Sequence, residues 1–323
     1  MLKRQFLCAL LVSLLALPLF AQSEQYGFFL FSGWLASFDA SQLPQRPGFG
    51  QPPPPNDLDL ILAYVTVSAA KNADVPRLSM EKFHIFEDNK EQKIDYFGIQ
   101  SQPLSIGIVW GAGTGFEGAG PIDPDVRECP RTFVRNSVPG SEFFLLSGDT
   151  VTTSYTTEPT RLPLNFAWSG ASSDTLFIGM DVLKEAANPR KILLVITNPS
   201  GGGGGQLQST YVERAAIRLG NTQVHVLSFS EGAAQDVNHE GSLFMNELVE
   251  LTGGSYYMGP VSSSSCPNLA KELRTQYLIG YHSTNTARDG KWRRLSVKMD
   301  STDGGPKLSA RIKRGYYAPK SGQ

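Results

Sequence analysis

Two kinds of hydrophobic pattern alternate along this chain. The first is a set of short segments, rich in β-branched and aromatic residues, in which apolar and polar positions alternate or nearly so. This pattern predicts strands with one face in a core and the other in solvent. The predicted strands are residues 60–67, 83–86, 93–97, 277–281, 295–299 and 308–312. The turn-forming residues Asp88 and Asn89 predict that 83–86 and 93–97 form a hairpin.

A different pattern fills the middle of the chain. Continuous apolar runs at residues 104–110, 191–197 and 223–229 predict strands buried on both faces. Gly253 and Gly254 are expected to end a helix. Because strands and helices alternate with short connections, we expect a largely parallel sheet with helices on both faces. The other predicted strands are 141–146, 151–155 and 256–258, and the predicted helices are 175–187, 211–219, 243–251 and 269–274.

This order of elements predicts an α/β domain inserted into a β domain. Residues 57–102 and 276–318 are expected to form one small β-sandwich, because short hairpins are barely stable alone. The α/β domain then occupies residues 103–275, and residues 319–323 form a tail. A chain of 323 residues, 41% of them hydrophobic, can support two such units.

The first residues indicate export. A basic pair at residues 3–4 precedes an almost wholly apolar run at residues 6–20. This pattern is typical of a secretory signal peptide over residues 1–21, cleaved near Ala21. The alternative is a retained membrane anchor, for which the run is short. Cys8 lies inside the run rather than at its end, which argues against a lipoprotein anchor. After cleavage, no membrane span is expected.

A proline- and glycine-rich stretch at residues 22–56 predicts a linker ahead of the first strand. Its four consecutive prolines at residues 52–55 are stiff and cannot join the interior of a sheet. The aromatic residues Phe28, Phe29 and Trp34 leave two interpretations open, docking on the folded body or loose order.

The charge balance argues against a nucleic-acid partner. The chain has 29 Lys and Arg against 30 Asp and Glu, so it has no chain-wide attraction to nucleic acid or acidic membranes. Residues 288–314 carry nine basic residues against three acidic ones. Within this segment, Leu295 and Val297 alternate with polar residues, which is typical of a half-buried strand with its charges in solvent.

Two cysteines, Cys129 and Cys266, remain in the chain after signal cleavage. Two thiols in an oxidising compartment often pair. The bridge would close a loop of about 137 residues and add about 4–5 kcal/mol of stability in the chain-entropy model. Two buried free cysteines are the alternative, because the sequence does not give the distance between them.

Segments at both ends of the predicted fold resemble one family. Residues 78–89 and 92–97 are similar to the entry motif of the von Willebrand factor A (VWA)-related proteins common in acidobacteria. Residues 272–281 resemble the exit motif of that family, with shorter matches at 290–294 and 314–317. The resemblance covers nearly the whole mature chain. It implies a VWA-like α/β fold with a binding surface at the carboxyl ends of the strands, where open α/β sheets bind ligands.

The resemblance also implies where a divalent cation would bind. The family motif supplies an Asp and two Ser from the first loop, a Thr from a second loop and an Asp after a later strand. These positions correspond, in that order, to Gly111, Gly113, Gly115, Thr175 and Asn198. Both carboxylates and both serine hydroxyls are replaced, whereas magnesium needs a full set of oxygen ligands. The resemblance therefore predicts a degenerate site without a metal, and no cofactor is expected.

Two roles are open for the remaining polar residues of this surface. Thr114, Glu117, Asp174 and Thr175 could provide a shifted cluster of oxygens, although loop carboxylates are usually just solvated. Together with Asn198, the same residues are the candidate partner-binding face.

No set of residues predicts catalysis. The four histidines, at positions 84, 225, 239 and 282, lack metal-ligand spacing, and a Gly-x-Ser-x-Gly nucleophile motif is absent. His225 alternates within an apolar strand and suits a core or edge position. The glycine run at residues 201–205 is placed like a phosphate-binding loop, but the Lys and Ser or Thr of such a loop do not follow it. A flexible connector is the better interpretation.

These features favour an exported, non-catalytic interaction module that is periplasmic, secreted or on the cell surface. Its partner would be a protein or another cell-envelope ligand, bound by loops at residues 111–118, 172–176 and 198–208. One alternative is a small-ligand receptor or hydrolase that uses the same face, which requires a deep pocket with converging polar groups. The other is a purely structural envelope protein.

Overall fold

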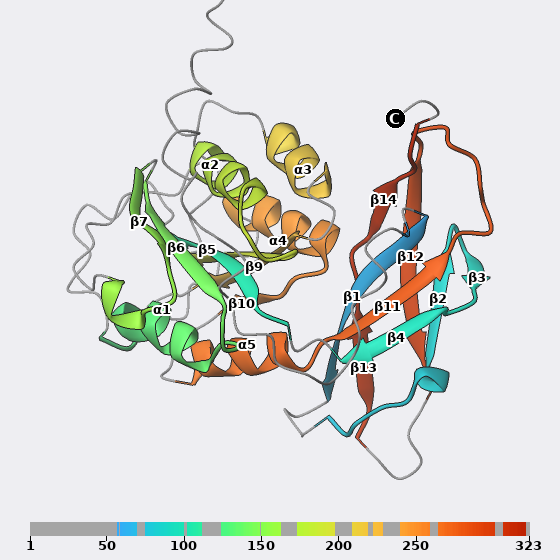
Figure 1. The fold of residues 1–323 in the computed structure, drawn as a ribbon, viewed down its shortest axis with the longest axis horizontal. Helices are drawn as coiled ribbons and strands as arrows, with labels where there is room; N and C mark the ends of the chain where they lie inside the picture. Colours follow the sequence, from blue (N-terminus) through green and yellow to red (C-terminus); the bar gives the residue numbers. More distant parts are fainter. Residues whose placement is uncertain are drawn as a thin grey trace, which may run out of the picture. The chain divides into compact units, whose positions relative to one another are not determined.

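The protein contains three β-sheets and five α-helices within the residues that the computed structural model describes (Figure 1). The expected signal peptide and linker, the glycine run and His239 lie outside these residues. The described residues are 57, 59–69, 75–99, 102–111, 124–148, 150–162, 173–197, 209–218, 222–228, 240–258, 264–300 and 306–320.

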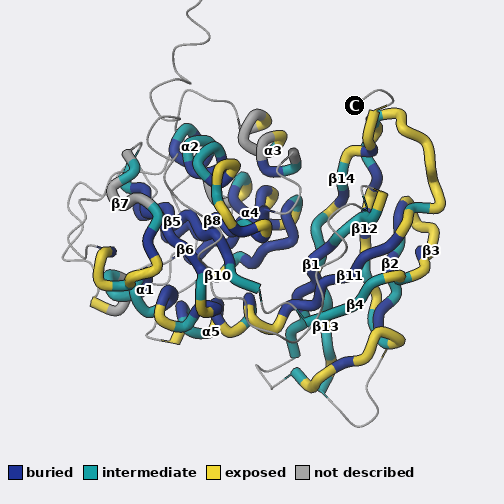
Figure 2. The backbone as a smooth tube through the Cα atoms, in the orientation of Figure 1, coloured by how far each residue is buried: buried dark blue, intermediate teal, exposed yellow. Residues whose placement is uncertain are grey.

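The central sheet has six strands in the order β10-β9-β8-β5-β6-β7. Neighbouring strands are parallel except at the edge, where β7 pairs antiparallel with β6. Strands β5 and β9 are buried at every position, as their continuous apolar runs predict (Figure 2). The strands are β5 (Leu104–Trp110), β6 (Glu142–Ser147), β7 (Thr150–Thr156), β8 (Arg190–Thr197), β9 (Thr222–Ser228) and β10 (Tyr256–Met258).

Helices cover both faces of this sheet (Figure 1). Helices α1 (Pro124–Asn136) and α5 (Ser265–Arg274) pack in one hydrophobic core. Helices α2 (Ser173–Lys184), α3 (Ser209–Arg218) and α4 (Glu240–Thr252) pack in a second core on the opposite face. None of the helices in the described ranges is both long and apolar enough to cross a bilayer. The predicted fold class is therefore confirmed for the α/β part.

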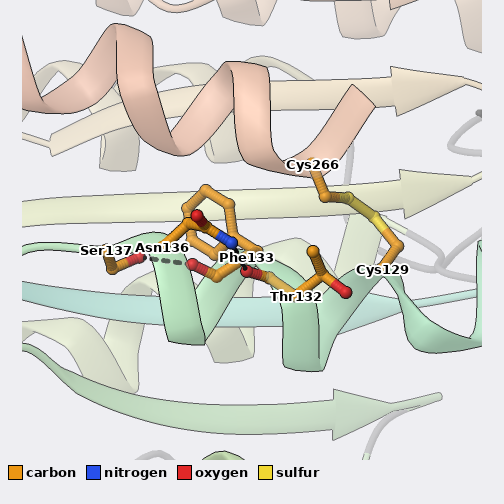
Figure 3. The surroundings of a disulfide bond; sticks show 6 residues. All are labelled: Cys129, Thr132, Phe133, Asn136, Ser137 and Cys266. Atoms are coloured by element: carbon orange, nitrogen blue, oxygen red, sulfur yellow. Dashed lines mark hydrogen bonds between the residues drawn. A yellow bond between two sulfur atoms is a disulfide. The ribbon is translucent and has the colours of Figure 1, made fainter. Parts of the chain in front are cut away.

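A disulfide joins the two helices on the first face, α1 and α5 (Figure 3). It links Cys129 to Cys266, whose Cα atoms are 5.5 Å apart. Both cysteines are buried, and Phe133 lies one turn further along α1 in the same core. Of the two alternatives that the sequence leaves open, the structure has the paired one.

Helix α4 ends at the two glycines that the sequence marks as its stop. Gly253 has a positive φ of 76°, a conformation that glycine adopts without strain. The N–H of Gly254 donates to the carbonyl of Val249 at 3.0 Å, which closes the helix end in the manner of a Schellman motif.

The segments before and after the α/β domain form two four-stranded sheets, in the orders β13-β1-β11-β4 and β14-β12-β2-β3. One core contains residues of both sheets, including Val65 of β1, Ile85 of β2 and Leu295 of β12. This confirms a sandwich made by the flanking segments. Its strands are β1 (Leu60–Ala69), β2 (Phe83–Glu87), β3 (Lys90–Gln92), β4 (Tyr96–Ile99), β11 (Tyr277–His282), β12 (Trp292–Met299), β13 (Leu308–Arg311) and β14 (Gly315–Tyr317). Two 3-10 turns, Met80–Lys82 and Pro159–Arg161, complete the described elements.

The hairpin differs from its prediction. Asp88 and Asn89 both have positive φ, at 47° and 68°, so they form a two-residue turn that pairs Glu87 with Lys90. The returning strand is therefore β3, directly after the turn, and not the predicted 93–97. The chain then crosses to the other sheet, where β4 pairs with β11. Residues 96–99 are largely apolar because they form β4, a strand of the other sheet.

Candidate functional site

The strand order places a crevice at the carboxyl ends of β5 and β8. On one side of β5 lies β6, and on the other side lies β8, so the order of the strands reverses between β5 and β8. Connections from two such strands leave toward opposite faces of the sheet, which opens a crevice between them. The register pairs Trp110 with Ile196 at these strand ends, and β9 continues the edge by pairing Ser228 with Thr197. We call this surface the carboxyl edge.

Gly111 is the first residue of the carboxyl edge after β5. It is buried and has a positive φ of 77°. Its N–H donates to the carbonyl oxygen of Ile196 at 3.0 Å, so the backbone bonds β5 to β8 at this point. Gly111 has no side-chain oxygen, and a larger residue would meet the strain of a left-handed backbone. At this position the edge therefore presents backbone and no ligating side chain.

Helix α2 brings two of the predicted site residues to the carboxyl edge. Leu176 and Met180 fix the helix in the core that also contains Val109 of β5. Thr175, in the first turn of α2, is fully buried, whereas its neighbour Asp174 is partly exposed. Asp174 is therefore the more accessible of these two residues, and its carboxylate is favourably placed near the positive end of the helix dipole.

The other predicted members of the site lie outside the described residues. They are Gly113, Thr114, Gly115, Glu117 and Asn198. The structure thus places Gly111, Asp174 and Thr175 at the carboxyl edge and leaves the rest of the candidate face as a prediction. Among the described residues, no three His, Cys, Asp or Glu side chains form a group that could hold a metal ion.

Ser228 is a polar residue of this edge that the sequence analysis missed. It is buried at the end of β9, and its Oγ has no hydrogen-bond partner among the described residues. Alternation along β9 places Ser228 on the same face as Val224 and Val226, the face that α2 covers. A buried hydroxyl without a partner costs about 1–3 kcal/mol. Its position as the last polar residue of an apolar strand is the signal that could have identified it.

His225 lies on the other face of β9 and is fully buried, so of the two predicted positions, core and edge, the structure has the core one. Its Nδ1 accepts a hydrogen bond from the N–H of Ser255 at 3.2 Å. Burial, with smaller effects from Arg311 and Arg190, lowers the pKa of His225 to about 3. The imidazole is therefore neutral at physiological pH, and its enclosure makes it unsuitable for exchanging protons with a ligand.

A second polar cluster lies at the junction of the α/β domain and the sandwich. The carboxylate of Glu272 accepts hydrogen bonds from Ser255 and Tyr257 and pairs with Arg311 of β13 at 3.2 Å. Burial and the nearby carboxylate raise the pKa of Tyr257. Because these side chains bond one another across the junction, they join the two domains and are not arranged around an open site.

No family model and no curated protein sequence matches the chain. Among solved structures, BatB, a conserved hypothetical protein from Bacteroides thetaiotaomicron, is 14% identical over 53% of this chain and 97% of its own, with a TM-score of 0.38. The SpRpn10 VWA domain is 14% identical over 53% of this chain and 94% of its own, with a TM-score of 0.36. The PilB minor pilin from Streptococcus sanguinis is 10% identical over 54% of this chain and 61% of its own, with a TM-score of 0.39. At these identities and TM-scores, the likeness concerns the general fold and assigns no family.

Proposed function

We propose that this chain is an exported, non-catalytic interaction module that binds a protein or cell-envelope ligand through its carboxyl edge, without a metal ion. The observation that carries this proposal is the backbone at Gly111. This residue directly follows β5, at the strand end where an open α/β sheet binds its ligand, and it offers no side-chain group there.

The chemistry of the described carboxyl edge supports binding without a metal. Magnesium takes near-octahedral oxygen ligands and is bound in proteins through one or two carboxylates. Next to Gly111, strands β8 and β9 end in the neutral hydroxyl side chains of Thr197 and Ser228, which are both buried. Asp174 contributes a carboxylate from the start of α2. Of these side chains, only Asp174 is partly exposed, so the described part of the edge offers a ligand a single charge contact.

A charge-reversal experiment tests the position of the binding surface. Asp174→Lys places the opposite charge at the carboxyl edge, and combining it with Glu117→Lys extends the change to the predicted neighbouring loop. Glu185→Lys is the matched control, because it makes the same kind of change at an exposed residue just after the other end of α2. We expect the double variant to lose at least about tenfold in affinity for the protein or cell-envelope ligand that the chain binds, which is about 1.4 kcal/mol of binding free energy. The control should bind this ligand as tightly as the unmodified protein does.

Equal binding by the double variant and the control would place the binding surface elsewhere on the molecule.

The metal-free part of the proposal has a separate test, the melting temperature with excess magnesium and with a chelator. An ion that binds the folded state stabilises it by mass action. We expect the same melting temperature in both conditions, and a rise with magnesium would contradict metal-free binding.

A further inference from the structure

His282, the last residue of β11, lies between two carboxylates of the sandwich. Its Nδ1 is 2.9 Å from Oδ2 of Asp95, and its Nε2 is 3.1 Å from Oδ2 of Asp57. The backbone N–H of His282 also donates to the same oxygen of Asp95, at 3.2 Å. We call this group of three side chains the His282 clamp.

The number of protons on the imidazole decides whether His282 can bond to both carboxylates at once. We call its contacts with Asp95 and Asp57 the two arms of the clamp. A neutral imidazole has one N–H donor and one nitrogen with a lone pair. If His282 were neutral, one of its two nitrogens would face a carboxylate oxygen without a proton between them. The imidazolium donates from both nitrogens, and such charge-assisted bonds are the stronger kind. The observed distances therefore fit the charged form.

Other charged groups near the clamp do not change its preference for a charged His282 over a neutral one. Lys93 lies 3.4 Å from Asp95, and Arg288 lies 3.3 Å from Asp59, two residues after Asp57 along the chain. The hydrogen bond with Asp95 is the largest cause that raises the pKa of His282, and the bond with Asp57 raises it further. The same contact with His282 lowers the pKa of Asp95. Asp95 also accepts the backbone N–H of His282 and lies closer to the ring, so it makes the stronger contact and Asp57 the weaker one.

The weaker arm is at the point where the chain enters the sandwich. Asp57 comes shortly before β1, and its carbonyl accepts the N–H of Leu60 at 3.4 Å. The pairing of β1 with β11 begins at this place, with Leu60 opposite His282. Holding Asp57 therefore holds the first paired residue of β1 against the end of β11.

We propose that the His282 clamp is a proton-operated latch, which ties residue 57 to the sandwich when the imidazole is charged and releases it when the imidazole is neutral. It would control how firmly residue 57 and the first paired residue of β1 are held against the end of β11. The latch depends on His282, Asp57 and Asp95 alone and is independent of the proposed binding at the carboxyl edge.

The direction of the pH dependence follows from the raised pKa of His282. A group whose folded-state pKa exceeds its unfolded value stabilises the contact below the unfolded value, about 6.5 for histidine. This stabilisation is lost as the pH rises through the folded-state pKa. Acidification therefore closes the latch, and alkaline pH opens it.

His84 provides a built-in comparison. Its Nδ1 is 2.7 Å from Glu91, and its Nε2 is 3.3 Å from Asp300, so it also lies between two carboxylates. These contacts tie the β2–β3 hairpin to the residue after β12, and none of them involves residue 57. Substituting His84 removes a similar titrating group and leaves the latch intact.

The test is hydrogen exchange of the full chain at pH 5.5 and pH 8.0, read as protection factors for residues 59–65, which correct for the intrinsic pH dependence of exchange. We expect protection at the start of this segment to fall about two- to fivefold at pH 8.0 in the unmodified protein, the range that an exposed ion pair contributes. His84→Gln should show the same fall. His282→Gln and Asp57→Asn should show none.

An NMR titration of the His282 ring gives an independent result and covers the case in which His282→Gln fails to fold. We expect a pKa above 6.5, lowered by Asp57→Asn and lowered more by Asp95→Asn. An unshifted pKa in the unmodified protein, or a fall in protection that persists in Asp57→Asn, would overturn the proposal.

Discussion

The guanidinium of Arg190 lies over the ring of Tyr64, with its Cζ 4.8 Å from the ring centroid. Arg190 begins β8 of the central sheet, and Tyr64 belongs to β1 of the sandwich, so this contact joins the two domains. Arg190 also donates to the carbonyl of Leu273 at 3.0 Å and to the side chain of Gln276. Gln276 in turn donates to Thr66 of β1 at 2.6 Å. A buried chain of hydrogen bonds therefore runs from β8 to β1.

Removing Arg190 is expected to destabilise the whole described fold. Arg190 is fully buried, and Arg190→Ala leaves the Leu273 carbonyl and the Gln276 amide oxygen without this donor. A buried polar group that loses its partner costs about 1–3 kcal/mol, so we expect a loss of about 3 kcal/mol or more. Urea unfolding followed by circular dichroism measures it. The control is Arg135→Ala, an exposed arginine paired with Glu128, where the expected loss is about 0–1 kcal/mol. Equal losses in the two variants would contradict a structural role for the junction.

Acidification is expected to destabilise the protein through His225. Its pKa is about 3 in the folded state because of burial, whereas an unfolded histidine titrates near 6.5. The unfolded state therefore binds an extra proton between these values, and the free energy of unfolding falls as the pH falls, by up to about 1.4 kcal/mol per pH unit from this group.

The variant His225→Asn isolates this contribution. Its amide oxygen can still accept the N–H of Ser255, but the side chain does not titrate. We expect urea unfolding between pH 6.5 and 4 to show a shallower pH dependence than in the unmodified protein. An unchanged slope would mean that other groups dominate acid unfolding.

Gly254 is expected to tolerate no side chain. A Cβ at this position would overlap the backbone carbonyl of Val224, which is held in the central sheet and cannot move away. We expect Gly254→Ala to lose more than about 3 kcal/mol or to fail to fold, in the range of severe overpacking. Gly140→Ala is a matched control, because Gly140 has a positive φ of 85° but its nearest neighbour is the Pro103 side chain, at 3.2 Å. There we expect about 1 kcal/mol, from backbone strain. If Gly254→Ala and Gly140→Ala had similar melting temperatures, the close approach of Gly254 to the Val224 carbonyl would be contradicted.

Loss of the disulfide is expected to weaken the packing of α1 on α5. The bridge between Cys129 and Cys266 spans 137 residues of sequence, so the chain-entropy model gives about 4–5 kcal/mol. The double variant Cys129→Ser, Cys266→Ser should therefore melt well below the oxidised protein. Reduced unmodified protein is the control, and it should resemble the double variant. If reduction leaves the melting temperature unchanged, the bridge adds no net stability.

Much of the α/β domain could be predicted because its strands are buried on both faces. A strand such as 104–110 has to be apolar throughout, and this leaves a continuous run in the sequence. Helix α1 was missed because Pro130 lies inside it, and a proline is expected to break a helix. Its apolar positions, which include Cys129, Phe133 and Val134, do have helical spacing. Its place is decided by packing against α5 and by the disulfide.

The candidate site could be predicted in part. Gly111 and Asp174 are at the carboxyl edge because each adjoins an element with a clear pattern. The burial of Thr175 and the orphaned hydroxyl of Ser228 could not be predicted, because both depend on how α2 and β9 pack. The His282 clamp was also missed. Its carboxylates at positions 57 and 95 lie 225 and 187 residues from His282 in sequence, so no local pattern reveals the cluster.

The sequence by itself determined most of the strands and helices and the insertion of an α/β domain into a sandwich, because burial imposes a periodicity on most elements. Tertiary structure alone decided how those elements are paired. Strand β1 bonds β11 along its first half and β13 along its second, and Arg190 reaches Gln276 across the junction. These contacts join residues far apart along the chain. The partners in these contacts are selected by shape and by hydrogen bonding in the assembled fold. Such selection produces no periodic pattern along the sequence from which the pairing could be predicted.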